Sequence, residues 1–310
     1  MGLSNAITGP LAAKVRRASF PLRAPSVPAS VEPPPPARPL GADYDTEWAR
    51  SAPARAVRAA LVEGVMRPIV AALAPTELHG VDRLDGLDGP VVFAANHHSH
   101  VDTPLLLTSI PLRWRHRVVV GAAADYFFGT QLQSAYSALV IGAIPIERTK
   151  VGRKSADLAR SLIEDGWSLL IFPEGGRSPD GCGQPFKGGA AYIAMRCGVP
   201  VVPIHVEGTG RVLPKGKSLP KRADTRLTFG APMLPAEGED ARKFAARIER
   251  AVAVLGDEAA TDWWQASRRA HRGTTPGLDG PHGVGAWRRT WAVSAKDKAV
   301  AKRKRRWPEI

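Results

Sequence analysis

Cysteine is scarce in this sequence, and so are acidic residues relative to basic ones. Its 310 residues include only Cys182 and Cys197, which excludes a disulfide framework as the basis of the fold. Neither cysteine stands at a metal-ligand spacing from a histidine, so we expect two thiols in a reducing compartment. The 29 acidic residues against 43 basic ones leave a net charge of +14. Such a charge suits an anionic partner: a lipid surface, a phosphorylated substrate or nucleic acid.

Long hydrophobic runs are missing as well. Lys14, Arg16 and Arg17 interrupt the apolar core that a signal peptide would need near the start of the chain. The longest uncharged run, residues 126–146, has about the 20 residues that a membrane-spanning helix requires. It contains two glutamines, two glycines and a proline, which is more typical of a folded helix followed by a strand. We therefore expect any membrane contact to be peripheral.

Composition divides the chain into four segments. Residues 1–45 are rich in proline, with four in a row at 33–36, and are expected to form a disordered extension. An amphipathic helical region should cover residues 46–75, and the main domain should cover residues 76–260. The last segment, residues 261–310, is a basic tail that contains tryptophan.

In the predicted helical region, apolar residues recur mostly every four positions, with arginines between them. This spacing is typical of an amphipathic helix, in which Pro68 should introduce a kink or a break. The apolar face can lie on a bilayer or pack on the chain's own domain, and the sequence leaves both open. The apolar positions are Trp48, Val57, Leu61, Val65, Ile69 and Leu73.

The main domain alternates apolar, strand-like runs with helical stretches. Strands are predicted at 90–95, 117–123, 139–146, 168–172 and 201–206. Helices are predicted at 104–110, 150–165, 188–197 and 241–255, the third ended by Gly198 and Pro200. This alternation predicts an α/β fold with a mostly parallel central sheet flanked by helices, preceded by the N-terminal amphipathic helical region.

The tail at residues 261–310 holds twelve lysines and arginines against four acidic residues, together with five of the eight tryptophans. Basic residues beside tryptophan suit a membrane interface, where indole lies at headgroup depth. A nucleic-acid-binding tail and a solvated chain end are the alternatives.

A turn with three histidines follows the strand predicted at 90–95. Residues 96–104 read NHHSHVDTP, and Asp102 or Thr103 before Pro104 makes a good helix N-terminus. The turn therefore lies at the carboxyl end of a strand, where open α/β sheets place their ligand crevice. Four residues separate His97 from Asp102, so the carboxylate can fold back onto one imidazole nitrogen. The other nitrogen can then accept a proton from a hydroxyl.

A metal site is the alternative for this group of histidines. His98 and His100 would join His97 as ligands, and Asp102 would have to supply a further one. No cluster of cysteine or glutamate lies nearby in the sequence, so we expect no metal.

Two further segments supply groups that can bind an anion. Residues 142–148 form a strand that delivers Arg148 to the edge of the sheet, and residues 172–178 read FPEGGRS. Gly175 and Gly176 allow backbone amides to approach a phosphate, which Arg148 and Arg177 can grip in a forked geometry. Glu174 can orient an arginine or bind a glycerol hydroxyl. Lys187 adds an ammonium group at the start of the helix predicted at 188–197.

The order of these segments, with residues 199–203 (VPVVP) after them, resembles the glycerolipid acyltransferase family, whose bacterial type member makes phosphatidic acid from lysophosphatidic acid. The similarity covers about residues 75–235. Ser99 fits the family's first motif, whereas Ile-Pro-Ile before Arg148 stands where the family often has an aromatic residue.

The resemblance implies that His97 is the general base and Asp102 its partner. It also implies that Pro203 helps to bind substrate and that the glycerol phosphate is bound by the loop residues. We expect these to be Arg148, Glu174, Gly175, Gly176, Arg177, Ser178 and Lys187.

The resemblance further implies an O-acyltransferase of phospholipid synthesis, acting on 1-acyl-sn-glycerol 3-phosphate or a related lysophospholipid or glycerol phosphate. Acyl-CoA or acyl carrier protein would be the co-substrate, with no resident cofactor. An anionic membrane surface is the expected partner, with no nucleic acid, at the cytoplasmic inner face of the plasma membrane. A non-catalytic lipid-binding protein on the same fold is the alternative.

Overall fold

The computed structural model describes residues 41–146, 153–178, 182–214 and 216–280. Most of the extension predicted at 1–45 lies outside these ranges. Its last residues, however, contact the domain: the Gly41 N–H donates to the Phe128 carbonyl at 3.1 Å, and Tyr44 packs on the Phe128 ring. The folded part therefore begins before residue 46.

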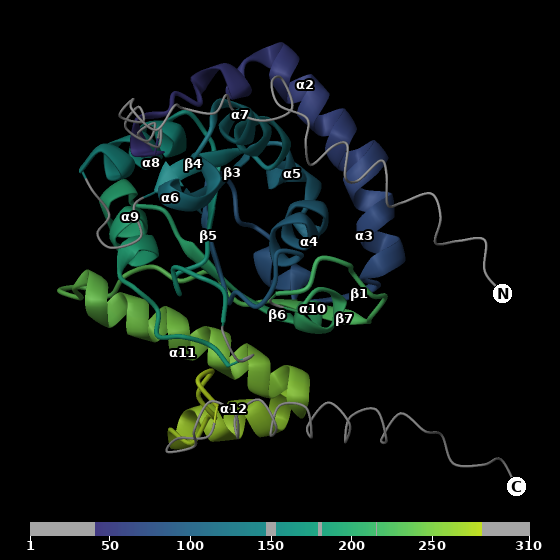
Figure 1. Ribbon diagram of the computed structural model, residues 1–310. Helices are drawn as coiled ribbons and strands as arrows, with labels where there is room; N and C mark the ends of the chain where they lie inside the picture. Colours follow the sequence, from purple (N-terminus) through teal and green to yellow (C-terminus); the bar gives the residue numbers. More distant parts are fainter. Residues whose placement is uncertain (1–40, 147–152, 179–181, 215, 281–310) are drawn as a thin grey trace, which may run out of the picture. The chain divides into compact units, whose positions relative to one another are not determined.

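A seven-stranded sheet organises the described residues (Figure 1). Its order is β1-β7-β6-β2-β5-β3-β4, and every neighbouring pair is parallel except β6 and β7. This confirms the predicted α/β class with a mostly parallel sheet. The strands are β1 (Thr76–His79), β2 (Val92–Ala95), β3 (Val118–Ala123), β4 (Ala143–Ile146), β5 (Ser168–Ile171), β6 (Val201–Glu207) and β7 (Thr225–Phe229).

Helices cover both faces of this sheet (Figure 1). Leu105 of α4 and Trp114 of α5 pack with Phe93 on one face, and Phe244 of α11 packs with Val92 on the other. Because successive strand residues point to opposite faces, β2 is buried and apolar at every position. The longer helices are α2 (Ala52–Leu61), α3 (Arg67–Leu73), α4 (Asp102–Ser109), α7 (Gln131–Val140), α8 (Arg153–Glu164), α9 (Gly189–Cys197), α11 (Ala241–Ala260) and α12 (Trp263–Arg272).

Shorter helical turns complete the described part of the chain. They are η1 (Gly41–Asp43), η2 (Glu47–Arg50), η3 (Val62–Met66), η4 (Val81–Leu84), α5 (Leu112–Arg115), α6 (Ala124–Phe127) and α10 (Thr209–Val212). Of these, η3 is a π-helical turn that joins α2 to α3. None of the helices in the described ranges is both long enough and apolar enough to cross a bilayer.

Most of the predicted elements are confirmed, with two wrong boundaries. The helix predicted at 241–255 ends too early, because α11 continues to Ala260. The strand predicted at 139–146 begins too early, because α7 continues to Val140 and β4 starts at Ala143. Gly142, with a φ of 65°, separates them, as is common where a helix ends. β1 and β7 have no counterpart among the predicted strands. β1 is mostly exposed and therefore lacks an apolar pattern.

The predicted amphipathic region forms one nearly continuous helix from α2 through η3 to α3. Pro68 is the second residue of α3, directly after η3, and a proline inside a helix removes one backbone hydrogen bond. The helix has a π turn just before this proline and is not broken there. The helix packs through Arg58 and Val70, which are buried. Arg58 donates to the Val118 carbonyl, and burial lowers its pKa to about 10. Three residues of the predicted apolar face are about half exposed: Val57, Val65 and Ile69.

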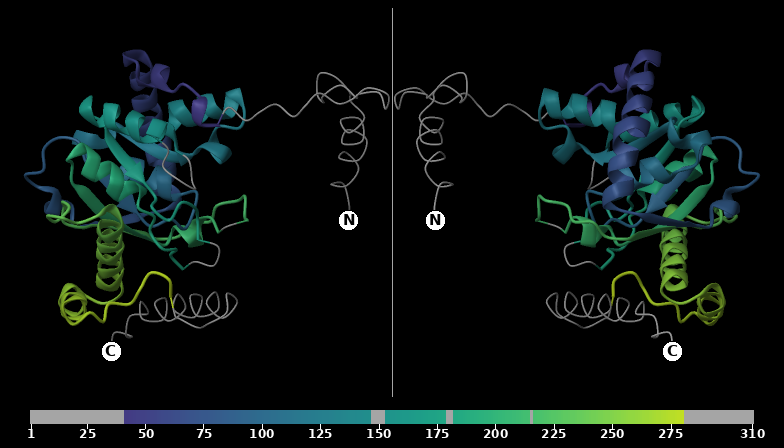
Figure 2. Two further views of the ribbon diagram at one scale, coloured as in Figure 1. Left: turned by 90° about the vertical axis from the view of Figure 1, so that its left-hand side faces the viewer. Right: turned by 90° about the vertical axis from the view of Figure 1, so that its right-hand side faces the viewer.

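α12 extends the folded domain into the predicted tail. Its Ala266 is buried, and Arg269 pairs with Asp257 of α11 at 2.6 Å. Figure 2 shows α12 lying across the end of α11. Beyond α12 the chain turns back, and the Leu278 carbonyl accepts the Gly183 N–H at 2.7 Å. Contacts therefore cross the domain boundary predicted at residue 260, while the rest of the predicted tail lies outside the described residues.

Candidate active site

The histidine turn lies between β2 and α4, as predicted. Asn96, directly after β2, donates through its amide to the Val206 carbonyl at 2.8 Å and accepts the Val206 N–H at 2.7 Å. The Ser99 hydroxyl donates to the Leu213 carbonyl at 2.8 Å. These bonds fix the turn to β6 and to the segment that follows it, at the carboxyl ends of the central strands.

His97 and Asp102 form the predicted pair. The His97 Nδ1 lies 2.8 Å from Oδ2 of Asp102. The same oxygen accepts the N–H groups of His98 at 2.7 Å and Ser99 at 2.8 Å, and the Asp102 side chain is fully buried. The His97 side chain keeps 16% of its surface exposed. Asp102 therefore orients the ring through Nδ1 and leaves Nε2 as the nitrogen that can take a proton.

Phe172 supports the same ring from one side. The rings of His97 and Phe172 stack with their centroids 4.1 Å apart and an interplanar angle of 21°. Phe172 is the first residue of the FPEGGRS segment, and no local sequence pattern indicates this contact. Its position at the end of β5, beside β2 in the sheet, is what brings it under the imidazole.

Glu174 joins the histidine turn to the FPEGGRS turn. Its Oε1 accepts the His97 N–H at 2.7 Å, its Oε2 accepts the Gln184 N–H at 2.9 Å, and only 2% of the residue is exposed. The Ser178 N–H adds a bond of 2.9 Å to the His97 carbonyl. Both Glu174 oxygens thus bind the backbone, which differs from the expected contact with an arginine or a glycerol hydroxyl.

Burial also changes the acidity of Glu174. It raises the pKa of this carboxyl group to about 7, against the opposing effect of the two backbone N–H groups. The group that holds the two turns together therefore changes its charge near neutral pH.

Gly175 and Lys187 are brought together, as predicted. Gly175 has a φ of 72°, and a side-chain carbon there would lie 2.7 Å from Nζ of Lys187. The Lys187 N–H donates to the Pro173 carbonyl at 2.9 Å. By contrast, a side-chain carbon on Gly176 would meet no atom within 4 Å. Glycine at 175 thus leaves room for the ammonium group above the turn.

Arg177 lies close to the histidine turn. The pKa of His100 is lowered first by burial and then by the positive charge of Arg177. His100 also stacks on Tyr126 of α6, with ring centroids 6.0 Å apart. The Arg177 side chain therefore lies near His100, which belongs to the same turn as His97. Tyr126 is a neighbour that local sequence patterns do not indicate.

Two of the predicted site residues are not placed in the crevice. Arg148 lies outside the described residues. Pro203 is buried within β6, opposite Ala94 of β2, and so lies below the edge where His97 emerges. Pro203 is therefore a buried residue of the sheet, and its position does not support the expected contact with substrate.

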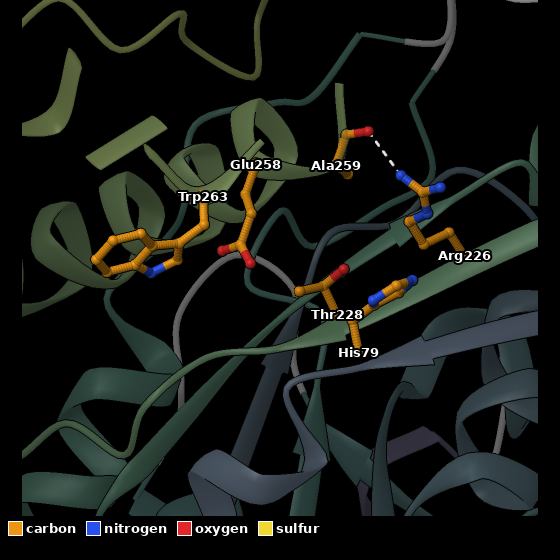
Figure 3. A pocket seen from close by; sticks show the side chains of 6 residues that line it. All are labelled: His79, Arg226, Thr228, Glu258, Ala259 and Trp263. Atoms are coloured by element: carbon orange, nitrogen blue, oxygen red, sulfur yellow. Dashed lines mark hydrogen bonds between the residues drawn. The ribbon is translucent and has the colours of Figure 1, made fainter. Parts of the chain in front are cut away.

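In the described ranges, no three side chains of histidine, cysteine, aspartate or glutamate converge to hold a metal ion. A cavity of about 190 Å³ lies elsewhere, beside β1, β7 and the end of α11 (Figure 3). Its charged residues pair with neighbours: Arg226 with Glu77 at 2.9 Å and Glu258 with Arg83 at 2.7 Å. β6 separates it from the strand that precedes His97.

Comparison with known proteins agrees with this arrangement. Residues 75–207 match the family model described as Acyltransferase. A chloroplastic 1-acyl-sn-glycerol-3-phosphate acyltransferase of Brassica napus is 33% identical over 161 residues, which cover 51% of this chain and 45% of that protein. The alpha form of the sheep (Ovis aries) enzyme of the same name is 26% identical, over 63% of this chain and 65% of that protein.

The chain therefore spans about half the length of the first of these relatives and two thirds of the second. Among solved structures, the 1-acyl-sn-glycerophosphate acyltransferase PlsC of Thermotoga maritima is similar, with a TM-score of 0.54 and 22% identity. The similarity covers 70% of this chain and 86% of that one, and it shows a shared fold.

Changing Glu174 to glutamine should flatten the pH dependence of stability. Because the folded state raises the pKa from 4.5 to about 7, it holds the proton more tightly than the unfolded state. The free energy of unfolding of the wild type should therefore fall, by up to about 3 kcal/mol, as the pH rises through this window. Glutamine does not titrate, so this contribution should vanish.

Urea unfolding of both proteins across this pH window measures the difference in slope. Glu237→Gln, at an exposed position, is the control and should keep the wild-type slope. If the Glu174→Gln protein kept that same slope, Glu174 would not be the group that titrates in this pH window.

Proposed function

We propose that this chain, whose residues 75–207 match the acyltransferase family model, transfers a fatty acyl group from a thioester to a free hydroxyl. The acceptor would be 1-acyl-sn-glycerol 3-phosphate or a related lysophospholipid or glycerol phosphate. The observation that carries the proposal is the His97–Asp102 pair, held against the FPEGGRS turn that bears Arg177. The names of the relatives support the choice of acceptor.

In the proposed reaction, Nε2 of His97 removes the proton from the acceptor hydroxyl while its oxygen attacks the thioester carbonyl. Asp102 stabilises the resulting imidazolium through Nδ1, and its bonds to the turn keep it in place. The carbon–sulfur bond then breaks, the acyl group stays on the acceptor oxygen, and the thiolate takes the proton back from His97. A seryl or cysteinyl acyl intermediate is not required.

The acceptor phosphate would be bound by the loop beside His97. Arg177 and Lys187 supply positive charge, Gly175 and Gly176 supply a turn that a phosphate can approach, and Arg148 would add a second guanidinium. Ser178 is buried, and its backbone N–H helps to position the loop by donating to the His97 carbonyl. Glu174 would act through the backbone that it holds, because both its oxygens already accept hydrogen bonds.

The donor would be acyl-CoA or acyl carrier protein, used as a co-substrate with no resident cofactor. The acceptor resides in membranes, so we place the protein peripherally on the inner face of the plasma membrane, in the cytoplasm. The exposed apolar residues Val57, Val65 and Ile69 on α2–α3, together with the net charge of +14, support contact with an anionic bilayer.

Replacing His97 by alanine should lower kcat by about 10²–10⁴-fold, because general-base assistance is lost. Thiol release from oleoyl-CoA in the presence of lysophosphatidic acid and vesicles measures turnover, and thermal unfolding checks the fold. His271→Ala, at an exposed position on α12, should remain fully active. Wild-type turnover by His97→Ala would refute the role. A wild type that binds lipid but releases no thiol would favour the non-catalytic alternative.

Replacing Arg177 by alanine should raise the KM for a phosphorylated acceptor by about tenfold or more, because a charged contact to phosphate is removed. The KM for the acyl donor should change little. Arg160→Ala, which removes an exposed arginine paired with Glu164 on α8, is the matched control. Equal acceptor KM values in both variants would show that Arg177 does not bind the acceptor phosphate.

Placing charge on the exposed face of α2–α3 should weaken membrane binding. The double change Val65→Glu and Ile69→Glu adds two negative charges where both side chains are half exposed, so the fold should tolerate it. Co-sedimentation with vesicles rich in anionic lipid should fall. Leu234→Glu is the control and should bind as the wild type does, because Leu234 is exposed beside α11, on the opposite face of the sheet. Undiminished binding by the double variant would rule this face out as the docking surface.

A further inference from the structure

The chain beyond α12 returns to the loop that follows the FPEGGRS turn. We call residues 274–280 the strap and residues 182–187 the acceptor loop. The Leu278 carbonyl of the strap accepts the Gly183 N–H of the acceptor loop at 2.7 Å. Leu278 is partly buried and Cys182 is 5% exposed, so the two segments cover one another.

Two glycines make this contact possible. A side-chain carbon on Gly183 would lie 2.7 Å from Cβ of Leu278, closer than such atoms can approach. On the strap, a side-chain carbon on Gly280 would lie 2.8 Å from Sγ of Cys182, and its φ of 71° also favours glycine. The backbone of each glycine therefore packs against a side chain of the other segment, and an unbonded larger side chain at either position would push the two segments apart.

The acceptor loop passes this contact on to the active site. Gln184, next to Gly183, donates its N–H to Oε2 of Glu174 at 2.9 Å, and its side chain donates to the Arg177 carbonyl at 3.3 Å. Oε1 of the same glutamate holds the His97 N–H. A short run of hydrogen bonds thus leads from Leu278 to the residues proposed to bind and activate the acceptor.

The strap has its own anchor. α12 is attached to α11 by the 2.6 Å pair of Arg269 with Asp257, whose side chain is 3% exposed. α11 also contacts the acceptor loop directly, since Glu249 accepts the Phe186 N–H at 2.9 Å. All of these anchoring residues lie beyond residue 207, where the match to the family model ends.

We propose that the strap is a positioning element for acceptor binding: by holding Gly183, it keeps Gln184, Glu174 and Arg177 in the geometry that receives the acceptor phosphate. The proposal rests on the proposed function for its kinetic test. The strap lies outside residues 75–207 and should affect binding of the acceptor through the acceptor loop, with little effect on the acyl donor.

The first test is Gly183→Ala in the full-length protein, in which the added methyl group must push Leu278 away. The KM for lysophosphatidic acid should rise by about tenfold, because small displacements of binding groups have large effects, while the KM for oleoyl-CoA should stay within about twofold. Gly64→Ala is the control, since a side-chain carbon there meets no atom within 4 Å. An acceptor KM within twofold of the wild type would overturn the proposal.

The second test is Gly280→Cys, which places a thiol beside Cys182. The Cβ atoms would be 3.6 Å apart, within the span that a disulfide bridges. When reduced, the new side chain should loosen the strap and raise the acceptor KM. Oxidised glutathione should convert the two thiols into a disulfide, yielding two molecules of reduced glutathione, and return the KM to near the wild-type value.

Wild-type protein treated with the same oxidant is the control. If Gly183→Ala fails to fold, the two redox states of Gly280→Cys decide the question, and equal acceptor KM values in both states would refute the proposal. If the wild type transfers no acyl group, the proposed function fails. Hydrogen exchange at residues 182–187 then tests the strap alone: it should be faster in Gly183→Ala than in Gly64→Ala, and equal rates would refute it.

Discussion

The hydrogen bonds of the Glu174 carboxylate join the two turns of the candidate active site, and the remaining geometry depends on them. One oxygen holds the backbone of His97 and the other holds Gln184, inside a site that is almost closed to solvent. Removing either contact would leave a buried donor without a partner. Burial raises the pKa of the same group to about 7, so the link between the histidine turn and the FPEGGRS turn combines rigidity with a charge that depends on pH.

The sheet explains why this link can form. β2 and β5 are parallel neighbours, with Phe93 opposite Leu170, so the turns that follow them emerge side by side. β6 lies on the other side of β2, and its Val206 fixes Asn96 through two hydrogen bonds. The imidazole is therefore positioned from three directions: by β6 through the turn, by Asp102 through Nδ1, and by Phe172 through stacking.

Two segments outside residues 75–207, the N-terminal helix and the C-terminal strap, bear on the proposed function in different ways. The N-terminal helix packs inward through Arg58 and Val70 and turns Val57, Val65 and Ile69 outward, which suits contact with a lipid surface. The strap packs on the acceptor loop, and α12, which precedes the strap, is attached to α11. Under the proposed function, a lipid acceptor would have to leave a bilayer and place its phosphate accurately, and these two additions would correspond to those two needs.

Local patterns in the sequence determined the α/β class, most of the central strands and the His97–Asp102 pair. Apolar alternation involves only neighbouring residues, and only four residues lie between His97 and Asp102, so both signals are local. They could not identify β1 and β7, whose few residues gain their pairing from strands far along the chain. Nor could they decide which face of α2–α3 is buried, or reveal the roles of Phe172, Glu174 and Leu278. Those roles depend on segments 75 to 95 residues apart meeting in space, and only the tertiary structure specifies such contacts.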